Sequence, residues 1–156
     1  MAAVLMAACN TNAVDPREKV IGAYDYVSGG QLNFSFMQEK FEIPMEGEGS
    51  FTISKYGDKD RLKIEIFNDS IFAVLSKNEI RIEEPVYTME IALDSFGIPM
   101  GRLEIEMEAA NDKIQVVDST LKWETDLEAT IKLNGVGLAG RGPLSITANK
   151  KQTNTK

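Results

Sequence analysis

The sequence has 156 residues, of which 43% are hydrophobic and 26% are charged, a balance typical of one globular domain with a single core. The net charge of -7 argues against nucleic acid or an anionic membrane surface as the main partner, because both require clustered Lys and Arg. The sequence has no histidine, the commonest general base, and its single cysteine excludes an intrachain disulfide and a cysteine-type zinc site. We therefore expect a protein that is not an enzyme and that carries no metal or other cofactor.

The first nine residues, MAAVLMAAC, are all apolar or small, and polar residues follow them. This run is too short to span a bilayer, which takes about 20 apolar residues. Its last part, Leu5 to Cys9, resembles the end of a bacterial lipoprotein signal peptide, in which small residues precede a cysteine that carries diacylglycerol. The resemblance implies an extracytoplasmic protein, anchored to the bacterial outer membrane through Cys9. The basic segment of such signal peptides is missing, so we expect the sequence to begin inside the leader. The alternative is a short buried strand with a core cysteine.

Three parts are predicted along the chain. Residues 1–14 are interpreted as a truncated lipoprotein signal peptide and tether, residues 15–151 as a single β-barrel domain, and residues 152–156 as a disordered tail. The domain begins with the pattern of a helix start, because Asp15 suits the N-cap and Pro16 suits the first helical position. Gly22 follows closely, so this helix is limited to about one turn.

From residue 23 onward, apolar and polar residues alternate with a period of two, which is typical of strands with one buried face. The expected strands are 23–27, 31–37, 49–56, 61–67, 71–76, 79–83, 87–94, 102–108, 114–117, 120–125, 127–133 and 144–148. Turn residues separate them at Ser28-Gly29-Gly30, Gly57-Asp58, Asn68-Asp69, Lys77-Asn78, Gly97-Ile98-Pro99, Asn111-Asp112 and Asn134-Gly135. Crossover helices, which a parallel sheet needs, have no room between these strands.

This pattern predicts an all-β fold, an antiparallel meander of about eight to ten strands closed into a barrel. Hairpin-length connections and one apolar face per strand both favour a barrel. The alternative is a β-sandwich, in which residues 39–48 would form the long connection that a Greek-key crossover requires.

A short N-terminal turn followed by Gly22-Ala23-Tyr24 resembles the Gly-x-Trp motif of lipocalins, which belong to the calycin superfamily. The whole domain looks most like the small calycin-like lipoproteins of Gram-negative bacteria. In lipocalins the Trp closes one end of the barrel beneath a basic residue from the last strand. The resemblance implies that Tyr24 takes this place and that Lys150 or Lys151 supplies the base. It also implies a cup-shaped barrel for a small apolar ligand, although the family includes barrels with filled interiors.

The predicted ligand-binding residues are large apolar side chains expected in the barrel interior or at its mouth. They are Tyr24, Phe34, Phe36, Phe51, Met89, Met107 and Trp123. Methionine adapts to ligands of varied shape, but the same residues also suit plain core packing. Two apolar segments, 96–100 and 136–138, are expected either to pack across the barrel mouth or to form an exposed contact surface.

Two other patterns are assigned ordinary structural roles. Glu104, Glu106 and Glu108 lie about 7 Å apart along one face of a strand, and we expect a solvated outer face there and not a metal site. The glycine-rich segment 135–140 is superficially similar to a dinucleotide fingerprint, but it lies between two strands and is interpreted as a hairpin loop or bulge.

Two functions remain open from the sequence. The first is an envelope-anchored lipoprotein that binds a small hydrophobic ligand without catalysis. The second is a structural or interaction protein with a filled barrel, which contacts another envelope protein. In both cases we expect membrane contact through the lipid anchor only and no nucleic-acid partner. A hydrolase that uses paired carboxylates is disfavoured, because chance pairs are expected among 24 acidic residues.

Overall fold

The computed structural model describes residues 14–66, 69–92, 102–133 and 136–154. A short 3-10 helix, η1 (Pro16–Lys19), precedes the strands and confirms the predicted helix start. The strands are β1 (Gly22–Phe36), β2 (Glu39–Pro44), β3 (Gly47–Lys55), β4 (Arg61–Ile66), β5 (Asp69–Ser76), β6 (Glu79–Ile82), β7 (Val86–Ala92), β8 (Arg102–Ala109), β9 (Lys113–Val117), β10 (Thr120–Leu133) and β11 (Val136–Lys150).

Eight of the strands form a closed antiparallel barrel, which confirms the predicted all-β meander. Their order is β1-β3-β4-β5-β6-β9-β10-β11, and β11 pairs with β1 to close the ring. Most neighbours in the ring are also neighbours in sequence, because hairpins connect them. The alternating apolar residues of these strands therefore face a common interior.

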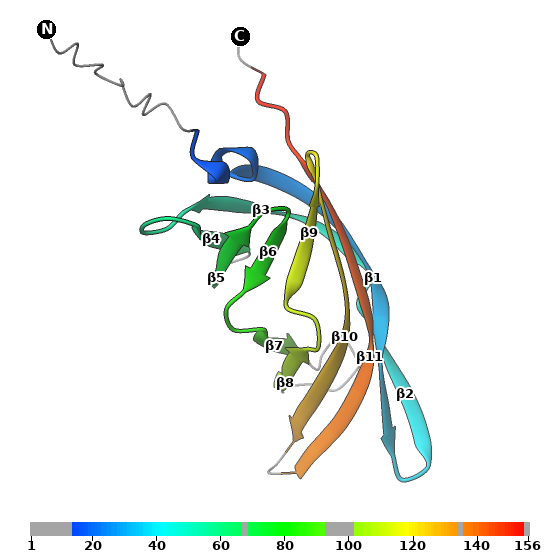
Figure 1. Ribbon diagram of the computed structural model, residues 1–156. Helices are drawn as coiled ribbons and strands as arrows, with labels where there is room; N and C mark the ends of the chain where they lie inside the picture. The colour runs from blue at the N-terminus through cyan, green and yellow to red at the C-terminus, as the bar shows by residue number, and fades with distance from the viewer. Residues whose placement is uncertain (1–13, 67–68, 93–101, 134–135, 155–156) are drawn as a thin grey trace, which may run out of the picture.

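Three strands are much longer than the others and extend beyond the barrel: β1 and β11 with 15 residues each, and β10 with 14. Outside the barrel, β2 pairs with β1, while β8 pairs with β10 and β7 pairs with β8. This gives a second region of the same sheet, with the order β2-β1-β11-β10-β8-β7, which we call the lower sheet. Figure 1 shows the long strands running from η1 down to the β1–β2 hairpin.

The lower sheet has two edge strands because two strands of the barrel wall are short. Strands β2 and β3 pair with successive parts of β1 in one register. In the same way, β6 pairs with β9 while β7 pairs with β8, the strand that precedes β9. Strands β4 and β5, which lie between β3 and β6 in the barrel, have only six and eight residues. Within the part of the chain that the structure describes, β2 and β7 are therefore the edges of the lower sheet.

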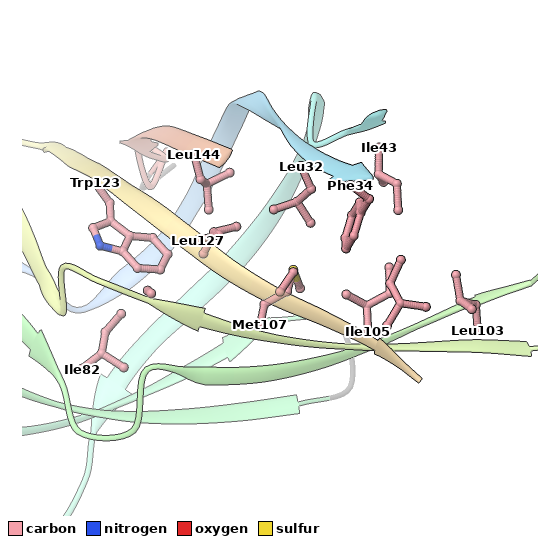
Figure 2. Close-up of a cluster of buried hydrophobic side chains, with 13 residues drawn as sticks. Leu32, Phe34, Ile43, Ile82, Leu103, Ile105, Met107, Trp123, Leu127 and Leu144 are labelled. Atoms are coloured by element: carbon pink, nitrogen blue, oxygen red, sulfur yellow. The ribbon is translucent and has the colours of Figure 1, made fainter. Parts of the chain in front are cut away.

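Two hydrophobic clusters fill the inside of the molecule. The barrel cluster contains Val20, Tyr24, Ile53, Leu62, Ile64, Ala73, Leu75, Ile80, Val116, Leu121 and Ala148. The lower cluster contains Leu32, Phe34, Ile43, Ile82, Leu103, Ile105, Met107, Ala109, Trp123, Leu127, Ala129, Ile131 and Leu144. Ile71 and Ile114 pack against both clusters, so the two cores are continuous. In Figure 2, Leu32 and Phe34 face Ile105 and Met107 across the lower cluster.

The turn predicted at Ser28-Gly29-Gly30 is wrong, because these residues lie inside β1. Gly30 has φ +129, and a Cβ there would lie 2.0 Å from the carbonyl oxygen of Pro143 in β11. Glycine at this position allows the backbones of β1 and β11 to approach closely, so here it marks a contact between strands and not a turn. The strands expected at 23–27 and 31–37 are consequently one strand.

Residues 39–48 do not form the long connection that the sandwich alternative required, because 39–44 form β2 and β3 begins at Gly47 after only two residues. The turn before β2 is Met37-Gln38, with φ values of 49° and 71°. Two-residue hairpin turns of this kind usually contain Asn-Gly or Asp-Gly, so no residue pattern marks this turn in advance.

Two further boundaries differ from the prediction. The strands expected at 120–125 and 127–133 are the single strand β10. The strand expected at 144–148 is the C-terminal part of β11, which begins at Val136 and pairs with β10 along its whole first half. The described part of the glycine-rich segment, 136–140, is thus strand and not a loop or bulge.

Candidate functional site

Tyr24 lies in the barrel core, and its hydroxyl bonds to the residue that follows η1. It is 1% exposed, its hydroxyl donates to the Val20 carbonyl at 2.8 Å, and its ring stacks on Phe51 with centroids 5.3 Å apart. Burial raises the pKa of Tyr24 to about 12. Lys150 packs over Gly22, and its Nζ donates to the Lys19 carbonyl at 3.3 Å. A lysine of the last strand therefore lies over the start of β1, where it holds η1 against the barrel.

A charged network around Arg17 holds the same end of the barrel, and the sequence reasoning missed it. The Arg17 guanidinium donates to the Asp15 carboxylate, with the shortest N–O distance 2.8 Å, and to the carbonyls of Gly57 and Arg61 at 3.1 and 3.3 Å. Hydrogen bonds from Arg17 hold the pKa of Asp15 well below its usual range. Lys55 pairs with the same carboxylate at 3.3 Å. In the described structure the partners of Arg17 and Lys55 are protein oxygens around η1, so the role of this network is to fix η1.

The structure places the described members of the predicted ligand-binding set in two regions of the interior and at one strand end. Tyr24 belongs to the barrel cluster and Phe51 packs against it, whereas Phe34, Met107 and Trp123 belong to the lower cluster. Phe36 shares the face of Phe34 on β1, but its side chain is 51% exposed at the end of the strand. Two more predicted residues are untested, because Cys9 and the side chain of Met89 lie outside the described residues.

Two hollows open on the surface of the described part of the protein. One, of about 580 Å³, runs across the middle of the long strands and is lined by Gly29, Gly30, Ala110, Asn111, Glu124, Thr125, Asp126, Pro143, Leu144 and Ser145. The other, of about 480 Å³, lies beside the turn at 57–60. None of the predicted ligand-binding residues lines either hollow. Tyr24, Phe34, Met107 and Trp123 instead belong to the packed core.

A small polar network lies between the barrel and the lower sheet. The Trp123 indole N–H donates to the Asn111 carbonyl at 2.8 Å, and the Asn111 backbone N–H donates to the Thr125 hydroxyl at 2.9 Å. The ring of Tyr87 meets Trp123 edge to face, with centroids 6.3 Å apart. The Tyr87 hydroxyl is buried without a hydrogen-bond partner in the described structure, and burial raises its pKa to about 12.

Large apolar side chains are exposed at the end of the lower sheet that lies opposite η1. Phe36, Met37 and Phe41 belong to the β1–β2 hairpin, and Val136 begins β11 at the same end of the lower sheet (Figure 1). Met37 is 82% exposed and Val136 is 63% exposed. We call these four residues the apolar end. Val136 had been singled out in the sequence, whereas the predicted apolar segment 96–100 lies outside the described residues.

The outer face of the lower sheet is acidic. Glu104, Glu106 and Glu108 project from β8, and the exposed Lys132 on β10 approaches Glu106 at 3.8 Å. In the described ranges, no three Asp, Glu or Cys side chains gather in an arrangement that could hold a metal ion. The described residues also include no helix long and apolar enough to cross a membrane.

Comparison with known proteins identifies no family. No family model matches the sequence, and no curated protein matches it. Among solved structures, the chain is similar to the crystal structure of ywiB protein from Bacillus subtilis, with a TM-score of 0.33 and 8% sequence identity, over 83% of this chain and 94% of that chain. A similarity this weak carries no argument about function.

Proposed function

We propose that the protein is a non-enzymatic binding protein of the cell envelope, which contacts a partner protein through the apolar end. The observation that carries this proposal is the exposure of Phe36, Met37 and Phe41 on one hairpin, with Val136 exposed at the same end of the lower sheet. Contiguous exposed apolar surface on a folded domain is typical of an interaction site. Burial of the exposed parts of Phe36 and Met37 alone would contribute about 3 kcal/mol to binding, before the costs of association.

The packing of the interior supports a contact surface on the outside of the protein. Side chains that were expected to surround a small ligand, such as Phe34 and Tyr24, fill two clusters. Ligand pockets typically enclose most of their ligand between apolar walls. The two open hollows described above do not have this form.

The position of the apolar end favours a protein partner over the anchoring membrane. In this proposal Cys9 carries the lipid, as the sequence around Leu5 to Cys9 indicates. Strand β1 separates η1 from the β1–β2 hairpin, and its 15 residues correspond to roughly 45 Å of extended chain. The apolar end therefore lies far from the first described residues after Cys9, at the opposite end of the molecule (Figure 1).

Site-specific photo-cross-linking in the native envelope tests this function. We would place p-benzoylphenylalanine at position 36 and, as a matched control, at position 56, where Tyr56 is another exposed aromatic residue on the barrel. We expect a discrete cross-linked protein from position 36, weaker when Met37→Ser is added, and no such product from position 56. Equal products from both positions, or a product that Met37→Ser leaves unchanged, would contradict the proposal.

A further inference from the structure

The two edge strands of the lower sheet differ in how their free backbone groups are protected. In an antiparallel pair, alternate residues exchange hydrogen bonds with the partner strand, and the residues between them direct their N–H and C=O groups to the other side. The Ala109 N–H donates to the Pro85 carbonyl at 2.9 Å in the register of the β7–β8 pair. Tyr87 therefore bonds to β8, whereas Val86 and Thr88 direct their backbone groups to the open edge.

Strand β2 carries features that oppose the addition of another strand. The Met45 N–H donates to the Gly30 carbonyl at 3.0 Å, which fixes the same alternation on this side. The edge-facing positions of β2 are therefore Lys40, Glu42 and Pro44. Lysine and proline at such positions are the usual protection of an edge strand, because a charge resists burial and proline has no N–H.

Strand β7 lacks this protection. Its seven residues, VYTMEIA, include no lysine and no proline, and four of them are β-branched or aromatic. Val86 is 50% exposed and Thr88 is exposed. Glu90 is the one charged residue of this strand, and it lies across from Glu104. A seven-residue edge with neither lysine nor proline is a ready template for an extended segment of another protein.

The charge of the neighbouring strand indicates what such a segment must contain. Thr88 lies directly across from Glu106, and Val86 lies across from Glu108, whose side chains project from the outer face of β8. β7 would lie between an added strand and β8, so the outward side chains of the added strand would start about 10 Å from these carboxylates. A long lysine side chain can cover most of this distance by extending over Val86 or Thr88, which are small. A second copy of the protein is disfavoured, because pairing of two β7 edges would bring two glutamate rows together.

We propose that β7 binds an extended segment of a partner protein, in which apolar and basic residues alternate, as an added strand of the lower sheet. The apolar side chains of this segment would continue the inner face of the lower sheet, and its basic side chains would lie on the acidic outer face. This site is separate from the apolar end, and neither site depends on the other.

A peptide titration with variants of the full chain tests the proposal. The probe is a blocked peptide of four Lys-Val repeats, and the control peptide contains four Glu-Val repeats. Binding is followed by the fluorescence of Trp123, the sole tryptophan of the chain, which contacts Tyr87 of β7, and by the exchange of the Val86 amide. Thr88→Pro removes an N–H that faces the open edge, and Glu42→Pro makes the same change on β2.

We expect the Lys-Val peptide to slow exchange of the Val86 amide and to bind the unmodified chain and Glu42→Pro equally. Thr88→Pro should weaken binding about tenfold, and the Glu-Val peptide should bind the unmodified chain about tenfold more weakly than the Lys-Val peptide. If Thr88→Pro does not fold, Thr88→Lys replaces it as the test variant, because it alters only an exposed side chain. Thr88→Lys should weaken binding of the Lys-Val peptide.

Three results would overturn the proposal: equal binding of both peptides, a loss of binding in Glu42→Pro that matches the loss in Thr88→Pro, or no effect of either change at Thr88. A dimer of the unmodified chain that Thr88→Pro abolishes would assign the edge to a second copy of the protein and would also overturn it.

Discussion

Removal of the side-chain hydroxyl group is expected to change the free energy of unfolding in opposite directions at two tyrosines, Tyr24 and Tyr87. The Tyr87 hydroxyl is buried without a hydrogen-bond partner in the described structure, whereas the Tyr24 hydroxyl donates to the Val20 carbonyl at 2.8 Å. Tyr→Phe removes the same atom in both cases and leaves the ring in place. The free energy of unfolding therefore reports on the hydrogen bond and on desolvation, with little change in packing.

The expected magnitudes follow from the net value of a hydrogen bond. A buried polar group without a partner costs about 1–3 kcal/mol, so Tyr87→Phe should raise the free energy of unfolding by about 1 kcal/mol. For a domain of this size, that corresponds to an increase in Tm of about 2–4 °C. Tyr24→Phe removes a made hydrogen bond and should lower the free energy of unfolding by about 1 kcal/mol.

Urea unfolding at pH 7, followed by far-UV circular dichroism, measures both changes. Circular dichroism is preferable to fluorescence here, because the Tyr87 ring contacts Trp123 and its substitution alters the emission directly. The m-values should stay equal to that of the unmodified protein, since neither change alters the surface exposed on unfolding. A loss of 1 kcal/mol or more in Tyr87→Phe would refute the reasoning, because it would mean that the hydroxyl has a partner.

Three further predictions concern a close backbone contact, an acid-sensitive carboxylate and the proposed lipid anchor. Gly30→Ala should destabilise the protein by more than about 2 kcal/mol in urea unfolding, because its Cβ would collide with β11, whereas Gly29→Ala, which meets no atom within 4 Å, should have little effect. Hydrogen bonds from Arg17 lower the pKa of Asp15, so the Asp15 carboxylate stabilises the folded state above its ordinary pKa, and this contribution is lost as the pH falls below that value. Asp15→Asn should therefore flatten the acid limb of a plot of Tm against pH. An unchanged acid limb would contradict this prediction. Cys9→Ala in the full precursor should move the protein from the membrane fraction to the aqueous fraction without unfolding it, and continued membrane association would show that lipidation at Cys9 is not the anchor.

The alternation of apolar and polar residues was sufficient to predict the barrel, because each strand must bury one face. Residues 61–67 and 102–108, for example, were predicted within one residue of the observed ends of β4 and β8. Turn positions were harder to predict, because glycine serves both turns and close contacts between strands. Gly30 lies inside a strand, while the turn at Met37-Gln38 contains neither glycine nor asparagine.

The candidate site was less predictable than the fold, because alternation indicates which face a residue occupies but not its position along the strand. Phe34 and Phe36 share a face of β1, but only Phe34 lies where the opposite wall of the lower sheet covers it. The lengths of β4 and β5, which determine the two edges of the lower sheet, depend on pairing that no local pattern reports. The role of Arg17 likewise depends on the distant carbonyls of Gly57 and Arg61.

Native mass spectrometry of the protein, extracted gently from its own host envelope, tests most directly whether the protein acts through its outer surface and not through a ligand in its interior. The account predicts the mass of the lipidated chain without a small-molecule adduct, alone or with a partner protein. A reproducible adduct of small-molecule mass that disappears on denaturation would contradict the account, because such a ligand would have to displace the packed side chains of the interior.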